Sequence, residues 1–281
     1  MPTHPSDSRI GFPPPYLGPR PCRLQVLRDL GDLLIVEKPA GVLATAHDWY
    51  PRLPDVAGAI NQQAAKGKPE LQRLGISKVW SVFGIDPEIS GAVLLARSES
   101  AAMFYRNQYG SRKLSLVFSF FSRNFNGRAE FRCELPLARH NTRPQLVVSR
   151  RRGKKATTVF SLREEFEGFS RWDVTTDFCR LHQIRVHAAE SGVPVIGERL
   201  YAKSARVFLS ELKPDYRERP DKPERPLHAG YCAYLRQVMF SGTSGEEVVV
   251  DVSMPRSLQV MYRRIRQHRG NKSENMLYSE G

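Results

Sequence analysis

Short apolar segments, separated by turn residues at the intervals of a meander, fill the second half of the chain. Such segments, rich in β-branched and aromatic residues, predict strands, and their close spacing predicts that neighbours pair antiparallel. With helices on either side, they predict an α+β fold built on a mixed, mostly antiparallel sheet. The expected strands are 114–121, 129–135, 145–149, 156–163, 171–176, 233–240 and 247–252.

The first half of the chain alternates between strands and helices. The apolar run at 33–42 predicts a buried strand that ends in a Lys-Pro-Ala-Gly turn. Shorter strands are expected around 79–82 and 92–96. Apolar residues at helical spacing, with glycine or proline at the ends, predict four helices in the whole chain. They are 55–66, 99–109, 181–191 and 256–267.

Proline content divides the chain into three parts. Residues 1–21 carry seven prolines and little periodicity, so we expect residues 1–23 to form an extended, flexible arm. Residues 24–268 are expected to form one ordered domain, and residues 269–281 a frayed tail. Within the domain, the Lys-, Arg-, Pro- and Asp-rich stretch 203–225 predicts a long surface loop.

The chain is strongly basic. Its 281 residues include 43 Lys and Arg against 29 Asp and Glu, which gives a formal charge of +14. The acidic residues are spread along the chain, so the excess favours a polyanionic partner, and nucleic acid is the first candidate. A membrane partner is not expected, because no apolar stretch approaches the ~18–20 residues that span a bilayer.

The cysteines and the N-terminus indicate a reduced, intracellular setting. The four cysteines are far apart and form no CxxC pair, which disfavours a zinc site or a disulfide framework. The first residues lack the apolar core of a secretory signal. We therefore expect a cytoplasmic protein with free thiols and no metal, and we expect it to be a monomer.

The segment VFGIDPEISGAVLLA, at Val82–Ala96, is the first that can carry chemistry. Asp86 and Glu88 lie in a turn that leads into a hydrophobic strand. A partly desolvated carboxylate at a strand edge suits a nucleophile or a general base. Asp-Pro is also a common turn initiator, so Asp86 can equally serve to bind backbone amides.

The segment CRLHQIRVHAAESGVPVIGERLYA, at Cys179–Ala202, is the second. On a helix, Arg180 and Ile184 share one face, and His182 and Arg185 lie on another. His182 and His187 are five residues apart, whereas the zinc-binding HxxxH pattern requires four, so a metal site is disfavoured.

Arg185 has two open interpretations from its position alone. Its guanidinium can pair with a buried carboxylate in a bidentate fork. It can equally form a salt bridge with Glu190 or Glu198, with no role in chemistry.

The stretch SRRRGKKATT carries five cations at the tip of an expected hairpin. A run of this kind is often only a solvated surface, but the charge of the whole chain agrees with phosphate contacts. We therefore predict an RNA- or DNA-binding tip. Its cations are Arg150, Arg151, Arg152, Lys154 and Lys155.

Taken together, these segments resemble the RluA-type family of RNA pseudouridine synthases. Four blocks match in order across about residues 24–255, nearly the whole ordered chain. LLIVEKPAGV is similar to the family's first strand and turn, and FGIDPEISGAVLLARS to its catalytic segment, H-R-L-D-x-x-T-S-G. RLHQIRVHAAESGVPVIGERLY resembles R-T-H-Q-I-R-V-H and the Gly-x-Pro-x-x-Gly-Asp-x-x-Tyr that follows, and RPLHAGYCAYL resembles a later Leu-His-Ala strand.

The resemblance implies a fold and a reaction. The fold is a mostly antiparallel sheet flanked by helices, with the active cleft across its middle, and residues 24–268 would form the catalytic domain. The reaction isomerises a uridine in structured RNA, ribosomal or transfer, without cofactor or metal. By position, Asp86 corresponds to the essential aspartate and Arg185 to the arginine that pairs with it, which would keep the carboxylate ionised. The uridine would be flipped out of its stack to reach Asp86.

The resemblance also places supporting residues. Ser115, Lys113, His182 and Ile184 would lie around the reacting base. Lys113, Arg180 and the basic tip would hold RNA phosphates.

Several family positions differ in this chain. Gly84 stands where the family has the arginine that helps to fill the space left by the flipped base. Ser115 stands where the family has a tyrosine, and it offers neither an aromatic face nor a phenol that titrates near ~10. The other departures are Phe83 for His, Ile89 for Thr, Phe178-Cys179 for Thr-Gly, and Glu198 for Asp.

Two hypotheses follow. The chain is a divergent pseudouridine synthase, or it is a non-catalytic RNA-binding relative that acts in RNA folding or ribosome assembly. Retention of Asp86 and Arg185 favours the enzyme, and Gly84 and Ser115 favour the binding protein. An unrelated hydrolase has only Asp86 and His182 in its favour, and the charge of the chain disfavours it.

Overall fold

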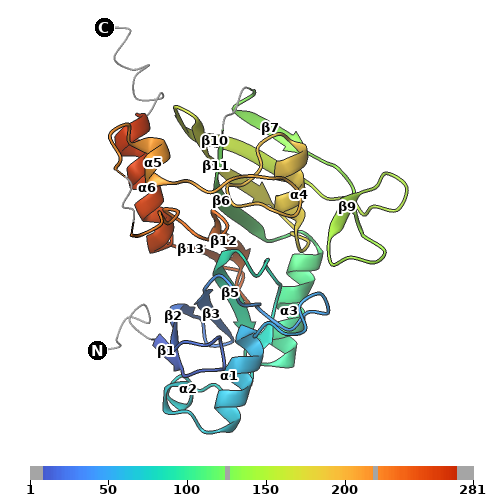
Figure 1. The fold of residues 1–281 in the computed structure, drawn as a ribbon. Helices are drawn as coiled ribbons and strands as arrows, with labels where there is room; N and C mark the ends of the chain where they lie inside the picture. The colour runs from blue at the N-terminus through green and yellow to red at the C-terminus, as the bar shows by residue number, and fades with distance from the viewer. Residues whose placement is uncertain (1–8, 124–126, 218–220, 271–281) are drawn as a thin grey trace, which may run out of the picture. The chain divides into compact units, whose positions relative to one another are not determined.

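The chain forms two compact units, each assembled from segments that are far apart in the sequence (Figure 1). The fold is that of a computed structural model, which describes residues 9–123, 127–217 and 221–270. The first unit comprises Met1–Leu116, Asp177–Leu181 and Leu235–Val252. The second comprises Val117–Thr176, His182–Tyr234 and Ser253–Gly281.

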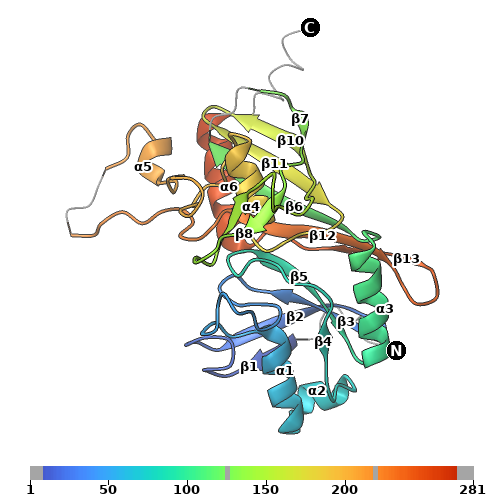
Figure 2. The same ribbon diagram turned by 90° about the vertical axis from the view of Figure 1, so that its right-hand side faces the viewer.

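The first unit is built on an antiparallel sheet. The strand order is β1, β2, β3, β5, β12, with β4 beside β5 and β13 beside β12. Strand β12 belongs to this unit from Leu235 onward, and Figure 2 shows it turning back into β13. The bounds are β1 Arg9–Phe12, β2 Cys22–Asp29, β3 Leu33–Lys38, β4 Trp80–Ser81, β5 Ser90–Ala96, β12 Ala233–Ser241 and β13 Glu247–Asp251.

Helices cover this sheet. The apolar faces of α1 (Val56–Ala65) and α2 (Pro69–Arg73) join residues of β1, β2, β3 and β5 in one buried cluster. Asp55 caps α1 by accepting the Gly58 N–H at 2.7 Å, which is why the helix begins where the sequence predicts. Helix α3 (Glu99–Gly110) packs on β12 through Tyr105, whose ring lies 5.7 Å from that of Phe240. Every residue of β5 is buried, as expected for a strand covered on both faces.

Gly91 shows how closely β5 and β12 approach. Its φ of +144° is one that residues with a side chain rarely adopt. A Cβ at this position would also lie 2.5 Å from the Cβ and 2.7 Å from the carbonyl oxygen of Leu235. Glycine is therefore required where the Asp86 segment enters the strand.

The second unit contains four further strands in the order β6, β11, β10, β7, and β10 runs antiparallel to both of its neighbours. A β-bulge between Leu162 and Glu164 reverses the side-chain alternation of β10. Thr158 therefore meets α4, whereas Glu164 meets α6, and these helices lie on opposite sides of the strands in Figure 1. The bounds are β6 Ser115–Arg123, β7 Glu130–Cys133, β8 Leu137–Arg139, β9 Leu146–Val148, β10 Thr158–Phe166, β11 Phe169–Thr176, α4 Gln183–Glu190, α5 Leu209–Leu212 and α6 Arg256–Arg269.

The predicted α+β class, with a mostly antiparallel sheet, is confirmed, and every predicted strand and helix is present within a few residues. Regular structure also occurs where none was expected. Strand β1 lies in the proline-rich arm, because Ile10 and Phe12 enter the buried cluster. Helix α5 interrupts the predicted loop 203–225, with Leu212 buried. The predicted tail 269–281 lies almost entirely outside the described residues, and the predicted domain limits stay a prediction.

Among the described residues, no helix combines the length and the apolar character needed to cross a membrane.

Candidate active site

Asp86 lies in the first unit, in the turn between β4 and β5. The residue is only 4% exposed. Its backbone carbonyl accepts the Ile89 N–H at 3.1 Å, which closes the turn over Pro87. The sequence places a partly desolvated carboxylate at this strand edge, and its burial agrees with that prediction.

A buried lysine, Lys38, binds the backbone of this turn at Pro87. The Pro87 carbonyl accepts the Gly41 N–H at 2.7 Å and the Lys38 Nζ at 3.3 Å. Lys38 Nζ also donates to the carbonyls of Val42 at 2.7 Å and Pro39 at 3.1 Å. One ammonium group thus joins the Lys-Pro-Ala-Gly turn to the Asp86 segment.

Lys38 is fully buried, and burial shifts its protonation equilibrium toward the neutral amine. Burial lowers the pKa of Lys38 from its ordinary 10.5 to about 7, against the carboxylates of Asp86 and Glu88, which raise it. The sequence pattern identifies this lysine only as part of a turn. The one available signal is a single cation two residues after the apolar run LLIV.

Helix α3 contacts the residues that precede Asp86, Ser81 and Phe83. Arg106 donates from Nε at 3.0 Å and from Nη2 at 2.7 Å to the Ser81 carbonyl. One helical turn later, Tyr109 stacks on Phe83, with ring centroids 5.2 Å apart. Residues 81–87 are therefore fixed from both sides within one unit.

Arg185 lies in the second unit, on α4, and forms a bidentate ion pair with Glu198. Its Nε and Nη2 donate to the two carboxylate oxygens at 2.8 and 2.9 Å. The two residues are 5% and 1% exposed. Burial acts to raise the pKa of Glu198, but the Arg185 hydrogen bonds outweigh it, and the pKa is lowered. Of the partners that the sequence left open, Glu198 therefore binds Arg185.

His182 and Tyr201 complete the surroundings of Arg185. His182 is buried and adopts φ +65°, a strained conformation for a residue with a side chain. Its Nδ1 lies 2.7 Å from the Tyr201 hydroxyl, which accepts the Leu146 N–H at 2.9 Å. The Arg185 guanidinium lies over the rings of Tyr201 and Tyr231, at 5.6 and 5.4 Å. The orientation of Arg185 is thus fixed by charge and by ring contacts.

The predicted site residues are divided between the two units. Asp86, Lys113, Ser115 and Arg180 belong to the first, and Arg185, His182 and Ile184 to the second. Lys113 is exposed after α3, Ser115 is half-buried at the start of β6, Ile184 is buried in α4, and Arg180 is half-buried. The second unit brings His182 and Arg185 together, with Nε2 and Nη1 3.4 Å apart. The ion pair between Asp86 and Arg185 stays a prediction.

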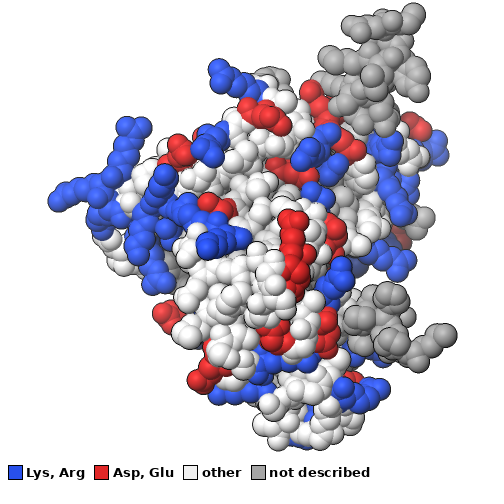
Figure 3. Space-filling model, turned by 180° about the vertical axis from the view of Figure 1, so that it is seen from behind, with Lys and Arg blue, Asp and Glu red and all other residues white. Residues whose placement is uncertain are grey.

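The basic tip follows β9 in the second unit, and all five of its cations are exposed. The turn is closed by the Gly153 N–H, which donates to the Ser149 carbonyl at 2.7 Å, and Lys154 pairs with Leu137 of β8. Figure 3 shows Lys and Arg side chains gathered over this β8–β9 region. The predicted hairpin is wrong, because β9 pairs with β8 whereas β10 pairs with β11 and β7. The basic tip is nevertheless an accessible cationic loop between β9 and β10.

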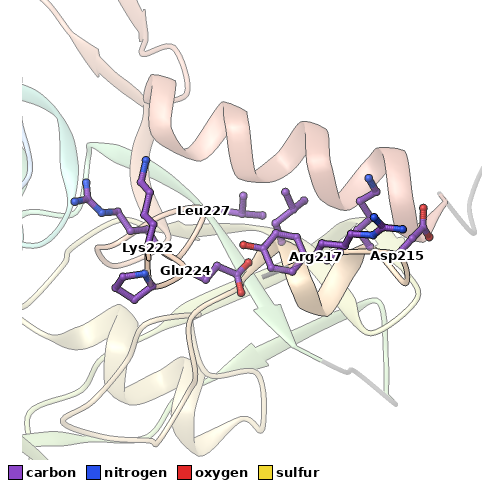
Figure 4. Close-up of a pocket in the computed structure, with 10 residues that line it drawn as sticks. Asp215, Arg217, Lys222, Glu224 and Leu227 are labelled. Atoms are coloured by element: carbon purple, nitrogen blue, oxygen red, sulfur yellow. The ribbon is translucent and has the colours of Figure 1, made fainter. Parts of the chain in front are cut away.

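A surface hollow of about 740 Å³ lies elsewhere in the second unit, beside α5. Figure 4 shows its lining, which includes Asp215, Arg217, Lys222, Glu224 and Leu227. None of the predicted site residues lines it. In the ranges that the structure describes, no three His, Cys, Asp or Glu side chains are grouped so as to hold a metal ion.

Comparison with known proteins decides the family. Residues 32–190 match the family model described as RNA pseudouridylate synthase. The chain belongs to this family. The stretch matched contains Asp86, Arg185 and the Lys38 turn, so the RluA-type resemblance is confirmed.

Individual relatives agree across most of the chain. Ribosomal large subunit pseudouridine synthase D of Zymomonas mobilis is 22% identical over 89% of this chain and 75% of its own length. The protein of the same name from Xanthomonas campestris is 24% identical over 92% of this chain and 74% of its own length. The solved structure of human RNA pseudouridylate synthase domain containing 4 has a TM-score of 0.66 at 16% identity, over 86% of this chain and 92% of that one. These findings show the pseudouridine synthase fold and an isomerase that acts on RNA.

Two departures of this synthase from the family pattern, Gly84 and Glu198, fit their surroundings. Gly84 is exposed, and a Cβ built on it would meet no atom within 4 Å. Its backbone therefore does not require glycine, and the space beside it is open. Glu198, one methylene longer than the family's aspartate, also accepts the N–H groups of Arg199 and Leu200 at 2.9 and 2.6 Å.

Glu198→Gln is expected to destabilise the synthase strongly. It leaves a buried guanidinium without its carboxylate, a change that costs about 3–5 kcal/mol in unfolding free energy. Because the folded-state pKa of Glu198 is lowered, its contribution is complete above the ordinary value of 4.5 and is lost as pH falls through the lower folded value. Urea unfolding should therefore show a wild-type advantage near neutral pH that shrinks below pH 4.5. Equal stability of this variant and Glu190→Gln, the exposed alternative, would contradict the ion pair.

Lys38→Met is expected to change the pH dependence of stability on the alkaline side. Between about 7 and 10.5 the unfolded chain keeps the Lys38 proton that the folded chain has lost, so wild-type stability rises with pH across that window. The variant lacks this rise. Unfolding measured at the two ends of the window tests this, with the exposed Lys66→Met as control. The prediction fails if the unfolding free energies of wild type and Lys38→Met change with pH in the same way.

Proposed function

We propose that this synthase isomerises specific uridines in structured RNA, ribosomal or transfer, with Asp86 as its catalytic aspartate and Arg185 as the ion-pair partner of Asp86. The observation that carries the proposal is the burial of Asp86 in a turn fixed on both sides. A carboxylate used only to cap backbone amides does not need that degree of fixation. A carboxylate that must meet one atom of a flipped nucleoside does.

The proposed reaction conserves every atom of the uridine. The bond between N1 of uracil and C1′ of ribose breaks, the base rotates, and a bond forms between C5 and C1′. The C5 proton is then released and N1 holds a proton, so the product is an isomer. Asp86 would act either as nucleophile or as general base, and both roles need it ionised.

Arg185 supports that ionised state. Glu198 binds the Nε and Nη2 nitrogens of its guanidinium, and we assign the positive charge of this guanidinium as the counter-charge of Asp86. Because ring contacts and Glu198 fix the guanidinium beforehand, little reorganisation accompanies catalysis. His182 and Ile184 would shape the wall behind the base, and Ser115 would border it in place of the family's tyrosine.

RNA contacts are assigned to the exposed cations. Lys113, Arg180 and the basic tip, Arg150–Lys155, would bind phosphates. The relatives named for the large ribosomal subunit support ribosomal RNA as the first substrate to test. We propose that the protein works as a monomer, without a metal or an organic cofactor.

Asp86→Asn is expected to abolish pseudouridine formation and to leave RNA affinity nearly unchanged, because the amide keeps the volume and loses the charge. Unmodified ribosomal and transfer RNA would be incubated with each protein, and modified positions mapped by chemical probing. Asp29→Asn, which loses an ion pair with Arg97 in the same unit, serves as the matched control and should stay active.

Equal turnover by wild type and Asp86→Asn would contradict the assignment of Asp86. If wild type itself formed no new pseudouridine while both proteins bound RNA in a salt-sensitive manner, the binding-only hypothesis would replace the enzyme. Gly84 and Ser115 are the residues that favour that second function.

Charge reversal at Arg151 and Lys154 together is expected to weaken RNA binding and flatten its salt dependence. Two lost phosphate contacts reduce the slope of log affinity against log salt by about 1.4 for single-stranded RNA. The same reversal at Arg23 and Arg28, two exposed arginines of β2, matches the change in net charge. If both double variants have the same slope, the tip is not part of the interface.

A further inference from the structure

Three aromatic rings form a stacked column beside the Asp86 segment. The rings of Phe83 and Tyr109 have centroids 5.2 Å apart and planes at 27°. Those of Tyr109 and Phe178 are 4.6 Å apart at 21°. All three residues belong to the first unit: Phe83 lies between β4 and β5, Tyr109 on α3, and Phe178 between β11 and α4.

The hydroxyl of Tyr109 fixes the column at its centre. It donates to the Cys179 carbonyl at 2.6 Å and accepts the Cys179 N–H at 3.0 Å. Burial raises the pKa of Tyr109 far above its ordinary value of 10, so the phenol stays protonated and keeps its donor. The ring of Tyr109 is therefore held by two stacked neighbours, and its hydroxyl acts both as donor and as acceptor.

One end of the column is the backbone that carries Asp86. Phe83 is 5% exposed and lies three residues before Asp86. Its carbonyl accepts the Ser81 hydroxyl at 2.8 Å, and Arg106 holds the carbonyl of Ser81. A displacement of the Phe83 ring would thus move the turn itself.

The other end is the loop that carries Arg180. The Arg180 guanidinium lies 5.0 Å from the centre of the Phe178 ring. Arg112, at the end of α3, pairs with Asp177 at 3.3 Å. Phe83 and Phe178 are both departures from the family pattern, and both rings stack on the same tyrosine.

We propose that Tyr109 is a positioning residue for Asp86, acting through Phe83 on one side and the Phe178–Cys179 loop on the other. The proposal rests on the catalytic role assigned to Asp86. It explains both departures, Phe83 and Phe178, by one structural role: each ring stacks on Tyr109. Where the family pattern places other side chains before its aspartate, this chain fixes that backbone by stacking.

Tyr105, one helical turn earlier, is the natural comparison. It is fully buried, its hydroxyl donates to Asp32 at 3.1 Å, and its ring packs edge-on against Phe240. It is therefore also a buried tyrosine with a hydrogen-bonded hydroxyl and a ring contact, but these two contacts lie away from residues 81–87. Removing either hydroxyl should lower stability, so both Phe variants should unfold at a lower urea concentration than wild type.

The test compares Tyr109→Phe and Tyr109→Leu with Tyr105→Phe. Turnover would be followed by release of tritium from RNA transcribed with uridine labelled at C5. We expect Tyr109→Leu to lower kcat about ten- to hundredfold, as for a small misplacement of a reacting group, with KM nearly unchanged. Tyr109→Phe keeps the stacked ring and loses the two hydrogen bonds to the Cys179 backbone. Its kcat should lie between those of wild type and Tyr109→Leu. Tyr105→Phe should leave kcat within about twofold of wild type.

Hydrogen exchange supplies a readout that does not depend on turnover. Amides of residues 82–91 should exchange faster in both Tyr109 variants and not in Tyr105→Phe, because of these two tyrosines it is Tyr109 whose ring stacks on that segment. Phe83→Leu and Phe178→Leu should also be non-additive in kcat, since both rings stack on Tyr109.

Loss of kcat that merely follows loss of stability, equally in the Tyr105 and Tyr109 variants, would overturn the proposal, as would unchanged exchange over residues 82–91. Failure of the proposed function looks different: Asp86→Asn would then match wild type. In that case the exchange measurement still decides whether Tyr109 orders the segment.

Discussion

One buried ammonium group organises the segment on which catalysis depends. Lys38 donates to three backbone carbonyls, and one of them belongs to Pro87, directly after Asp86. Burying a lone cation in an apolar core is costly, so such a group persists only where several acceptors surround it. The strand β3 that ends at Lys38 and the turn that holds Asp86 are thereby joined at a single point. The position of Asp86 follows from that junction and from the contacts of α3 on the other side.

Arg185 solves a comparable problem in the second unit by different means. A guanidinium cannot lose its proton in a protein, so its burial needs a permanent counter-charge. Glu198 supplies that charge, and the carboxylate is itself held by backbone N–H groups that follow it. Lys38 relies on neutral carbonyls and a lowered pKa, whereas Arg185 relies on an ion pair. Each unit therefore carries its own compensated cation, and neither arrangement depends on RNA being bound.

The sequence predicts best those elements that are determined by residues close to them in the chain. Helix α1 is predicted closely because Asp55 caps it locally, and the strands because their apolar pattern is local as well. Strand β1 is missed because its burial depends on α1 and α2, far along the chain, while the prolines around it indicate a flexible arm. Asp86 and Arg185 are found through motifs. Glu198 is named only as one of two partners, since charge alone does not show which carboxylate is buried.

The column around Tyr109 shows why departures from a motif need a three-dimensional explanation. Taken singly, Phe83 and Phe178 look like lost polar residues. In space both rings stack on Tyr109. The two replacements of family residues therefore together create one set of apolar contacts. Gly84, between Phe83 and the turn, has open space at its Cβ position and no such compensation. These three departures therefore fall into two kinds: Phe83 and Phe178 rebuild support for the Asp86 segment, and Gly84 leaves room beside it. A protein that only bound RNA would have no need to rebuild the support, and this asymmetry favours an enzyme.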